Sequence, residues 1–286
     1  MESSQPSGSF KDRGMAHLCS TLKQTGVSSL ICSSGGNAGL AVAAMARKLE
    51  MSAHVIVPET TKAIMLDKIR AHGAHVTVHG ANWNEADKLA RSLVAEDQGA
   101  EYIPPYEHPL LWEGHSSLVD ELVEAGVKPG AVVASVGGGG LLCGIALGMQ
   151  RHGWNDTRLI AAETHGANCL AAAVAAGEPV KLDAITSIAT SLGALQCSPT
   201  ALKLFEQHKG ECAMVTDEQA VRACAQMLSH HRVLVEPACG AAIAAALHEP
   251  QRSRLSDLES VVIVVCGGSG VDFNIMEQWR ADGLWE

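Results

Sequence analysis

The feature that most constrains the fold is the alternation of short β-branched runs with longer stretches of helical periodicity. The runs occupy residues 29–32, 54–57, 75–78, 131–136, 159–163 and 261–266. Short apolar runs separated by helix-length segments are typical of consecutive strand and helix units. Runs such as AVVASV at 131–136 are apolar on both faces, as expected for parallel strands covered by helices on each side. The sequence therefore predicts an α/β fold of mostly parallel, twisted sheets flanked by helices.

The proline pair in YIPPYEHP, at residues 102–109, interrupts this alternation. Three or four strand and helix units precede it, and a new helix is expected near Trp112. We therefore predict a small α/β domain at 14–106 and a large domain formed by 1–13 together with 107–286. Because ligands of open α/β sheets bind beyond the carboxyl ends of the strands, a site between the two domains is expected.

Charge and composition exclude several classes of partner. The formal net charge is −10 and no run of lysine or arginine occurs, so nucleic acid is not an expected partner. The apolar stretches are too short to cross a bilayer, and the first residues lack a signal-like apolar core. The nine cysteines include no CxxC pair, which indicates reduced thiols. A cytoplasmic protein bound to neither nucleic acid nor membrane is the expectation.

Three glycine-rich loops each follow a predicted strand: SSGGNAG at 33–39, GGGG at 137–140 and CGGSG at 266–270. The second leads into a helix-like segment, so unobstructed backbone N–H groups and a helix N-terminus would converge on one point and bind a phosphate. It has neither the GK[ST] of a Walker loop nor the GxGxxG of a dinucleotide site. A tight turn without a ligand is the alternative.

The first loop offers N–H donors, hydroxyls and the Asn37 amide at the start of another helix. This combination suits a carboxylate ligand. The alternative is that Ser33 or Ser34 only caps the helix, which is the commoner role of such residues.

Lys11, in SGSFKDRG, has an aromatic neighbour and small residues before it. A single lysine is usually a solvated surface charge. Close to a phosphate site in a cleft, however, desolvation and nearby cations would lower its pKa and make its amine able to form a Schiff base. Lys11 is therefore the leading candidate for a catalytic residue.

Six blocks carry a resemblance to a known family: PSGSFK, CSSGGNAG, IPPYEHPLLWEGH, SVGGGGLLCG, LVEPACGAA and VIVVCGGS. In order and spacing they resemble the fold-type II pyridoxal-phosphate enzymes, most closely the animal liver-type L-serine/L-threonine dehydratases. The resemblance covers the whole chain. It implies a two-lobed, tryptophan synthase β-like fold with pyridoxal 5'-phosphate in the interdomain cleft, a homodimer, and conversion of L-serine to pyruvate and ammonia and of L-threonine to 2-oxobutyrate.

The resemblance also implies roles for residues around the cofactor. Lys11 would hold it as a Schiff base and then act as the general base, Phe10 would cover one face of its ring, and Asn37 would bind the ring hydroxyl. Cys266 would lie at the pyridine nitrogen, where a thiol does not favour protonation and so favours elimination over transamination. The phosphate would be held by Gly137, Gly138, Gly139, Gly140 and Leu141.

Two further sets of residues follow from the same resemblance. The substrate carboxylate would be gripped by Ser34, Gly35, Asn37 and Ala38. Glu163 would lie near a monovalent-cation site for K⁺ or Na⁺, although a carboxylate that only caps a helix is the alternative.

The sequence also departs from the family pattern. It begins almost at the lysine motif, where relatives carry some tens of residues upstream, so a catalytically weak cofactor-binding remnant is one alternative. Asp12 resembles threonine synthase, which makes a threonine synthase-like reaction the other. Gly35 stands where many dehydratases have alanine, and the sequence therefore predicts that Gly35→Ala speeds turnover.

Overall fold

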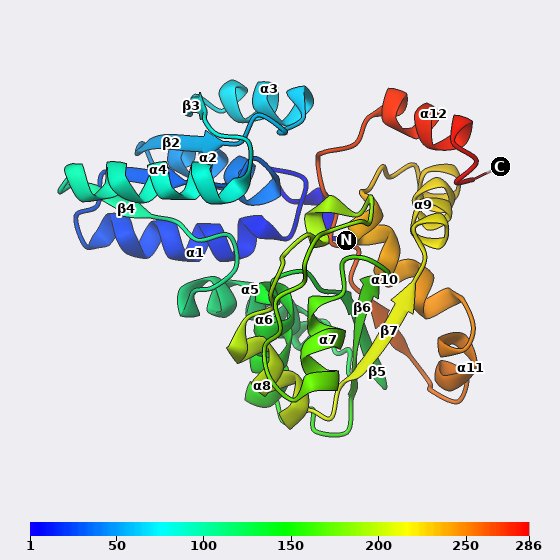
Figure 1. Cartoon of the computed structure of the whole chain (residues 1–286). Helices are drawn as coiled ribbons and strands as arrows, with labels where there is room; N and C mark the ends of the chain where they lie inside the picture. The colour runs from blue at the N-terminus through cyan, green and yellow to red at the C-terminus, as the bar shows by residue number, and fades with distance from the viewer. Residues whose placement is uncertain (286) are drawn as a thin grey trace.

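The computed structural model describes residues 1–285 and contains two four-stranded sheets surrounded by helices (Figure 1). In the first sheet the strand order is β3-β2-β1-β4, with β1 (Ser29–Cys32), β2 (Ser52–Val57), β3 (His75–Val78) and β4 (Ala100–Tyr102). In the second the order is β7-β6-β5-β8, with β5 (Ala131–Ser135), β6 (Arg158–Thr164), β7 (Glu211–Val215) and β8 (Val261–Ile263). All neighbouring strands pair in parallel. The predicted α/β fold of parallel sheets is confirmed.

Helices connect these strands in the order expected of parallel sheets. In the first half of the chain they are α1 (Lys11–Gln24), α2 (Asn37–Lys48), α3 (Ala63–Ala71), α4 (Trp83–Glu96) and α5 (Pro109–Glu124). In the second half they are α6 (Gly140–Arg151), α7 (Cys169–Ala176), α8 (Pro199–Gln207), α9 (Asp217–Gln226), α10 (Pro237–Leu247), α11 (Gln251–Leu255) and α12 (Phe273–Ala281). Within residues 1–285, none of them is long and apolar enough to span a membrane.

Helix α1 joins the two halves of the molecule, because it packs against α2 on one side and α5 on the other. Its contact with α5 depends on glycine. A side chain at Gly114 of α5 would put its Cβ 2.7 Å from the Cα of Gly14 and 2.5 Å from the carbonyl oxygen of Arg13. The two backbones therefore approach each other closely, and this contact fixes the position of Lys11 at the first residue of α1.

The strand predictions differ from the structure mainly at the sheet edges. The runs at 29–32 and 75–78 match β1 and β3, and those near 54, 131 and 159 match β2, β5 and β6 within two residues at each end. The 261–266 run is a strand only at 261–263, and β4 and β7 were not predicted. Both missed strands are edge strands with partly buried side chains, so their hydrophobic signal is weak. The helix expected near Trp112 is α5, whereas the domain boundaries at residues 13/14 and 106/107 stay a prediction.

Candidate active site

The segment before Lys11 is fastened to the third glycine loop by backbone contacts. Phe10 N–H donates to the carbonyl oxygen of Cys266 at 3.1 Å, and Gly268 N–H donates to the carbonyl oxygen of Gly8 at 2.8 Å. Ser9 and Gly267 form an isolated antiparallel bridge between the same two segments. The start of α1 and the end of the second sheet are thus held together, which places Lys11 beside the loop that follows β8.

The Lys11 amine is enclosed at this junction. Its Nζ donates to the carbonyl oxygen of Pro105 at 2.5 Å and lies 5.0 Å from the centre of the Phe10 ring. Burial lowers the pKa of Lys11 to about 8, against the opposing influence of the Cys32 and Cys266 thiols. An amine with this pKa is partly neutral near pH 7, and neutral amines attack carbonyl carbons and accept protons.

The loop at 137–140 connects the fully buried strand β5 to α6 and leaves no room for side chains. A Cβ on Gly138 would lie 2.4 Å from Cγ of Tyr106, and one on Gly139 would lie 2.4 Å from Cβ of Ala201. Gly139 also has φ of +96°, in the left-handed region. Helix geometry leaves the N–H groups of the first turn of α6, including that of Leu141, without intrahelical partners. This arrangement fits a phosphate group.

The loop at 33–39 lies at the start of α2. Ser33 is buried and donates to Asp87 Oδ1 at 2.8 Å, so its hydroxyl supports the loop from the side of α4. Ser34 and Gly35 are partly exposed, whereas Ala38 is buried. Gly36 precedes the helix and no side-chain hydrogen bond caps it. The first N–H groups of α2 are therefore free of a side-chain cap, and the carboxylate site stays a prediction.

Asn37 reaches across to the second half of the chain. Its Oδ1 accepts from Ser269 N–H at 2.9 Å, and its Nδ2 donates to both carboxylate oxygens of Glu236, at 3.1 and 3.0 Å. Ser191 donates its hydroxyl proton to the same carboxylate. The first and third glycine loops, far apart in the sequence, thus meet at the Asn37 side chain.

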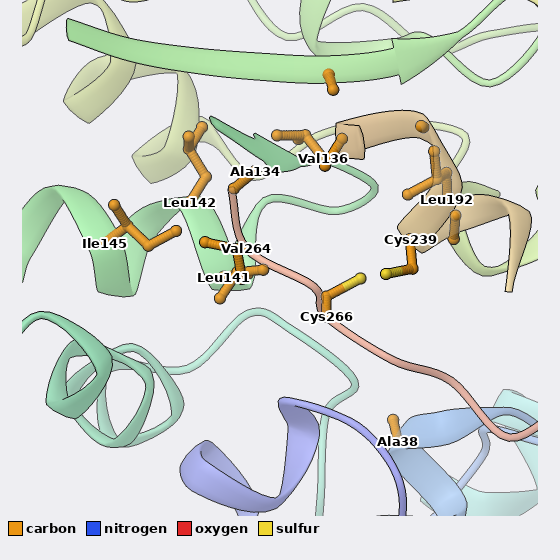
Figure 2. Packing of buried hydrophobic residues seen from close by; sticks show 14 of the residues in the cluster. Ala38, Ala134, Val136, Leu141, Leu142, Ile145, Leu192, Cys239, Val264 and Cys266 are labelled. Carbon is orange, nitrogen blue, oxygen red and sulfur yellow. The ribbon is translucent and has the colours of Figure 1, made fainter. Parts of the chain in front are cut away.

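Val264 N–H donates to the carbonyl oxygen of Val133 and so continues the hydrogen bonds of the sheet past β8. Cys266 follows two residues later and is buried, with its Sγ 3.4 Å from Ser135 Oγ. Figure 2 shows its sulfur pointing toward that of Cys239 in α10. Burial and a hydrogen bond to Cys266 raise the pKa of the Cys239 thiol well above its usual value, so this thiol stays protonated. The same hydrogen bond lowers the pKa of Cys266. Cys239 is fully buried in α10, and the surroundings of Cys266 thus contain the hydroxyl of Ser135 and the thiol of Cys239.

Glu163 lies in β6 with its side chain fully buried. Its two carboxylate oxygens accept from Leu170 N–H at 2.9 Å and Ala171 N–H at 2.8 Å, at the start of α7. Burial raises the pKa of Glu163 to about 7 despite these two hydrogen bonds. Among the described residues, no group of three or more His, Cys, Asp or Glu side chains is arranged to hold a metal ion. The Glu163 carboxylate caps α7, and the cation beside it stays a prediction.

Several residues around Lys11 were missed at the level of sequence. Glu236 and Ser191 bind Asn37, Tyr106 covers the 137–140 loop, and the His115 ring lies 5.0 Å from that of Phe10. His115 is fully buried, and neither ring nitrogen has a hydrogen-bond partner within residues 1–285. The signal for Glu236 was a charged residue in the otherwise apolar block LVEPACGAA, where a buried carboxylate needs partners.

Asp12 has a structural role in this molecule. It is buried and accepts from Ser7 N–H at 2.6 Å, so it shapes the turn that precedes Lys11. The surroundings of Gly35 argue against the expected benefit of alanine, which stays a prediction. A Cβ there would lie 2.6 Å from both γ atoms of Thr61, so the added methyl group would displace Thr61 or the loop.

Comparisons with known proteins agree with this geometry. The family described as pyridoxal-phosphate dependent enzyme matches residues 1–267. The human L-serine dehydratase/L-threonine deaminase is 46% identical over 278 residues, covering 95% of this chain and 85% of that protein. The human serine dehydratase-like protein is 45% identical over 95% of this chain and 84% of its own. The crystal structure of a fungal L-serine ammonia-lyase from Rhizomucor miehei superposes with a TM-score of 0.92 at 36% identity, covering 98% of this chain and 91% of that one. The chain therefore belongs to the family of pyridoxal-phosphate-dependent enzymes.

Proposed function

We propose that the protein eliminates water from L-serine to give pyruvate and ammonia, and from L-threonine to give 2-oxobutyrate and ammonia. The observation that carries the proposal is the enclosed Lys11 amine, with its lowered pKa, beside the glycine loop that follows β8. The choice of substrate rests on the similarity to proteins named L-serine dehydratase/L-threonine deaminase and L-serine ammonia-lyase.

The residues present fit pyridoxal 5'-phosphate. The 137–140 loop has no room for side chains, so its backbone N–H groups are unobstructed. These N–H groups and that of Leu141 would hold the phosphate. Phe10 would cover one face of the ring, Asn37 would bind the ring hydroxyl, and Cys266 would meet the ring nitrogen. When bound, the cofactor withdraws electrons from the substrate α-carbon and so makes its proton acidic.

The protein's own groups then orient the substrate and move the proton. The N–H groups at the start of α2, with the Ser34 hydroxyl, would hold the substrate carboxylate and so fix the α-carbon in front of Lys11. The Lys11 amine, once free, would take the α-proton, and its pKa of about 8 is suited to gaining and losing a proton near neutral pH. Cys266, unlike an aspartate, would not favour protonation of the ring nitrogen, and this favours elimination.

A product assay tests the reaction. The purified protein, loaded with pyridoxal phosphate, is given L-serine or L-threonine, and keto acid and ammonia are measured in parallel. Equal amounts of pyruvate and ammonia from L-serine, abolished in Lys11→Ala, are expected. Threonine formed from a phosphorylated hydroxy amino acid would favour the threonine synthase-like alternative. Cofactor binding without release of any keto acid would favour the weak remnant.

Three further properties belong to the same proposal and rest on the family resemblance. A K⁺ or Na⁺ ion would lie near Glu163, whose carboxylate accepts hydrogen bonds from two N–H groups at the start of α7. The protein would be a homodimer located in the cytoplasm. Sedimentation velocity and the dependence of the rate on potassium concentration test the first two of these directly.

A further inference from the structure

The Glu236 carboxylate connects segments that are distant in the sequence. Its side chain is buried, with 5% of the residue exposed, just before the first residue of α10. Its Oε1 accepts from Gly270 N–H at 2.6 Å, and both of its oxygens accept from Asn37 Nδ2. Ser191 donates to Oε2. Because a carboxylate buried without partners is costly, this full set of donors accounts for a charged residue at this place.

These contacts fix the orientation of the Asn37 amide. Ser269 N–H donates to Asn37 Oδ1 at 2.9 Å, on the opposite side from Glu236. A backbone N–H only donates and an ionised carboxylate only accepts, so a flipped amide would face a donor with its NH₂ and an acceptor with its oxygen. Only one orientation is compatible with both neighbours.

We propose that Glu236 is a positioning residue whose carboxylate holds the Asn37 amide in the one orientation that presents an N–H to the cofactor, and ties the 33–39 loop to the 266–270 loop. An amide NH₂ carries two N–H donors. Glu236 engages one of them, and the other would exchange the 3.4 Å contact between Asn37 Nδ2 and Ser191 Oγ for the ring hydroxyl. The inference rests on the proposed role of Asn37 in binding the cofactor. The new element is that Asn37 needs the negative charge of Glu236, which comes from a different segment of the chain.

Glu236→Gln tests the inference in the apoprotein. The glutamine NH₂ would face either Asn37 Nδ2 or Gly270 N–H, and a flipped Asn37 would face Ser269 N–H, so every arrangement leaves two donors in contact. Exchange of the Asn37 side-chain amide protons, followed by NMR, is expected to become at least about ten-fold faster. The dissociation constant of pyridoxal phosphate is expected to rise by about ten- to a hundred-fold.

Glu218→Gln is the matched control, because Glu218 is an exposed residue of α9 whose only partner within residues 1–285 is Arg222 on the next turn. The same change of carboxylate to amide there should leave both measurements within about two-fold. Unchanged Asn37 exchange and unchanged cofactor affinity in Glu236→Gln would overturn the proposal. Faster exchange with unchanged cofactor affinity would overturn it as well, because Asn37 would then be mobile without consequence for the cofactor.

The double variant Asn37→Asp with Glu236→Gln exchanges the carboxylate and the amide. The new aspartate would accept from both Ser269 N–H and the glutamine NH₂, so the link between the two loops is restored while the N–H toward the cofactor is lost. Thermal stability of the apoprotein should return to that of the parent, and cofactor affinity should stay low. If Glu236→Gln alone does not fold, recovery of folding in the double variant supports the proposal and failure contradicts it. None of these readouts requires turnover, so they stand apart from the test of the reaction.

Discussion

The two glycine loops that flank the site are held in different ways. The 137–140 loop is enclosed by atoms that cannot easily move: a Cβ on Gly137 would lie 3.0 Å from Cα of Leu192, and one on Gly139 would lie 2.4 Å from Cβ of Ala201. The 33–39 loop is held through the Asn37 side chain, and the nearest atom to a Cβ on Gly36 is 3.9 Å away.

This difference matches the proposed ligands. A phosphate that stays in place is best bound by a backbone whose N–H groups are fixed in advance. A substrate carboxylate must enter and leave in every cycle, so its loop needs space on one side and a hydrogen-bonded anchor on the other. Alanine substitutions at Gly139, Gly35 and Gly36 should therefore have graded effects, largest at Gly139 in the phosphate loop.

Gly139→Ala should have the largest effect. The residue has φ of +96° and its new methyl group would contact Ala201, so strain and overlap add. We expect the free energy of unfolding of the apoprotein to fall by about 3 kcal/mol, and cofactor affinity to fall by about a hundred-fold. Urea unfolding and cofactor titration measure both. In the double variant with Ala201→Gly, the free energy of unfolding should recover only the part lost through overlap. About 1–2 kcal/mol should stay lost, because the backbone strain remains.

Glu163 is connected to the phosphate loop through α7. Its carboxylate caps α7, and the Sγ of Cys169, the first residue of that helix, lies 3.3 Å from the carbonyl oxygen of Gly137. Its carboxyl has a pKa of about 7 in the folded protein and 4.5 as the ordinary value, so the folded state binds more protons between these limits. The carboxyl's contribution to stability is therefore present at pH 4.5 and lost as the pH rises through 7, by up to about 3 kcal/mol.

Unfolding of the apoprotein between pH 4.5 and 7.5, in buffers without sodium or potassium, measures this effect. Glu163→Gln should remove the pH-dependent part and leave the remaining profile unchanged. An identical profile in the two proteins would show that the carboxyl keeps its ordinary pKa. Added potassium should reduce the loss of stability near pH 7 if the cation binds beside the carboxylate.

Gly35→Ala should have an intermediate effect on the substrate loop. The new methyl group would overlap the Thr61 side chain at 2.6 Å, so the loop must shift. We expect kcat/KM for L-serine to fall by about ten-fold while cofactor affinity stays the same. Thr61→Ala in the same chain should restore most of the loss, because it removes both overlapping atoms. A faster single variant would support the original expectation from sequence instead.

Gly36→Ala should have the smallest effect, although it is the neighbouring residue. Its φ of −109° is open to any residue, and its Cβ would have only Ser34 Oγ nearby. Kinetic constants for L-serine should stay within about two-fold of the parent. A loss as large as that of Gly35→Ala would mean that the open space beside Gly36 is filled by the substrate.

The sequence predicted the parts of this molecule that depend on local pattern. Strand β5 is apolar on both faces and four glycines follow it, so both the strand and the loop could be predicted. The contacts of Asn37 with Ser269 and Glu236 span about two hundred residues, and no local pattern shows which partner a side chain meets. The position of Thr61 beside Gly35 is likewise a matter of tertiary packing, which is why the expected effect of alanine changes sign.

The central claim is that Lys11 carries the cofactor and acts on serine. The visible absorption spectrum of the purified protein with pyridoxal phosphate, recorded before and after addition of L-serine and compared with Lys11→Ala, tests it most directly. The account predicts a Schiff-base band that requires Lys11 and changes when serine is added, as pyruvate accumulates. A band of equal strength in Lys11→Ala, or the absence of any band in the parent protein, would contradict it.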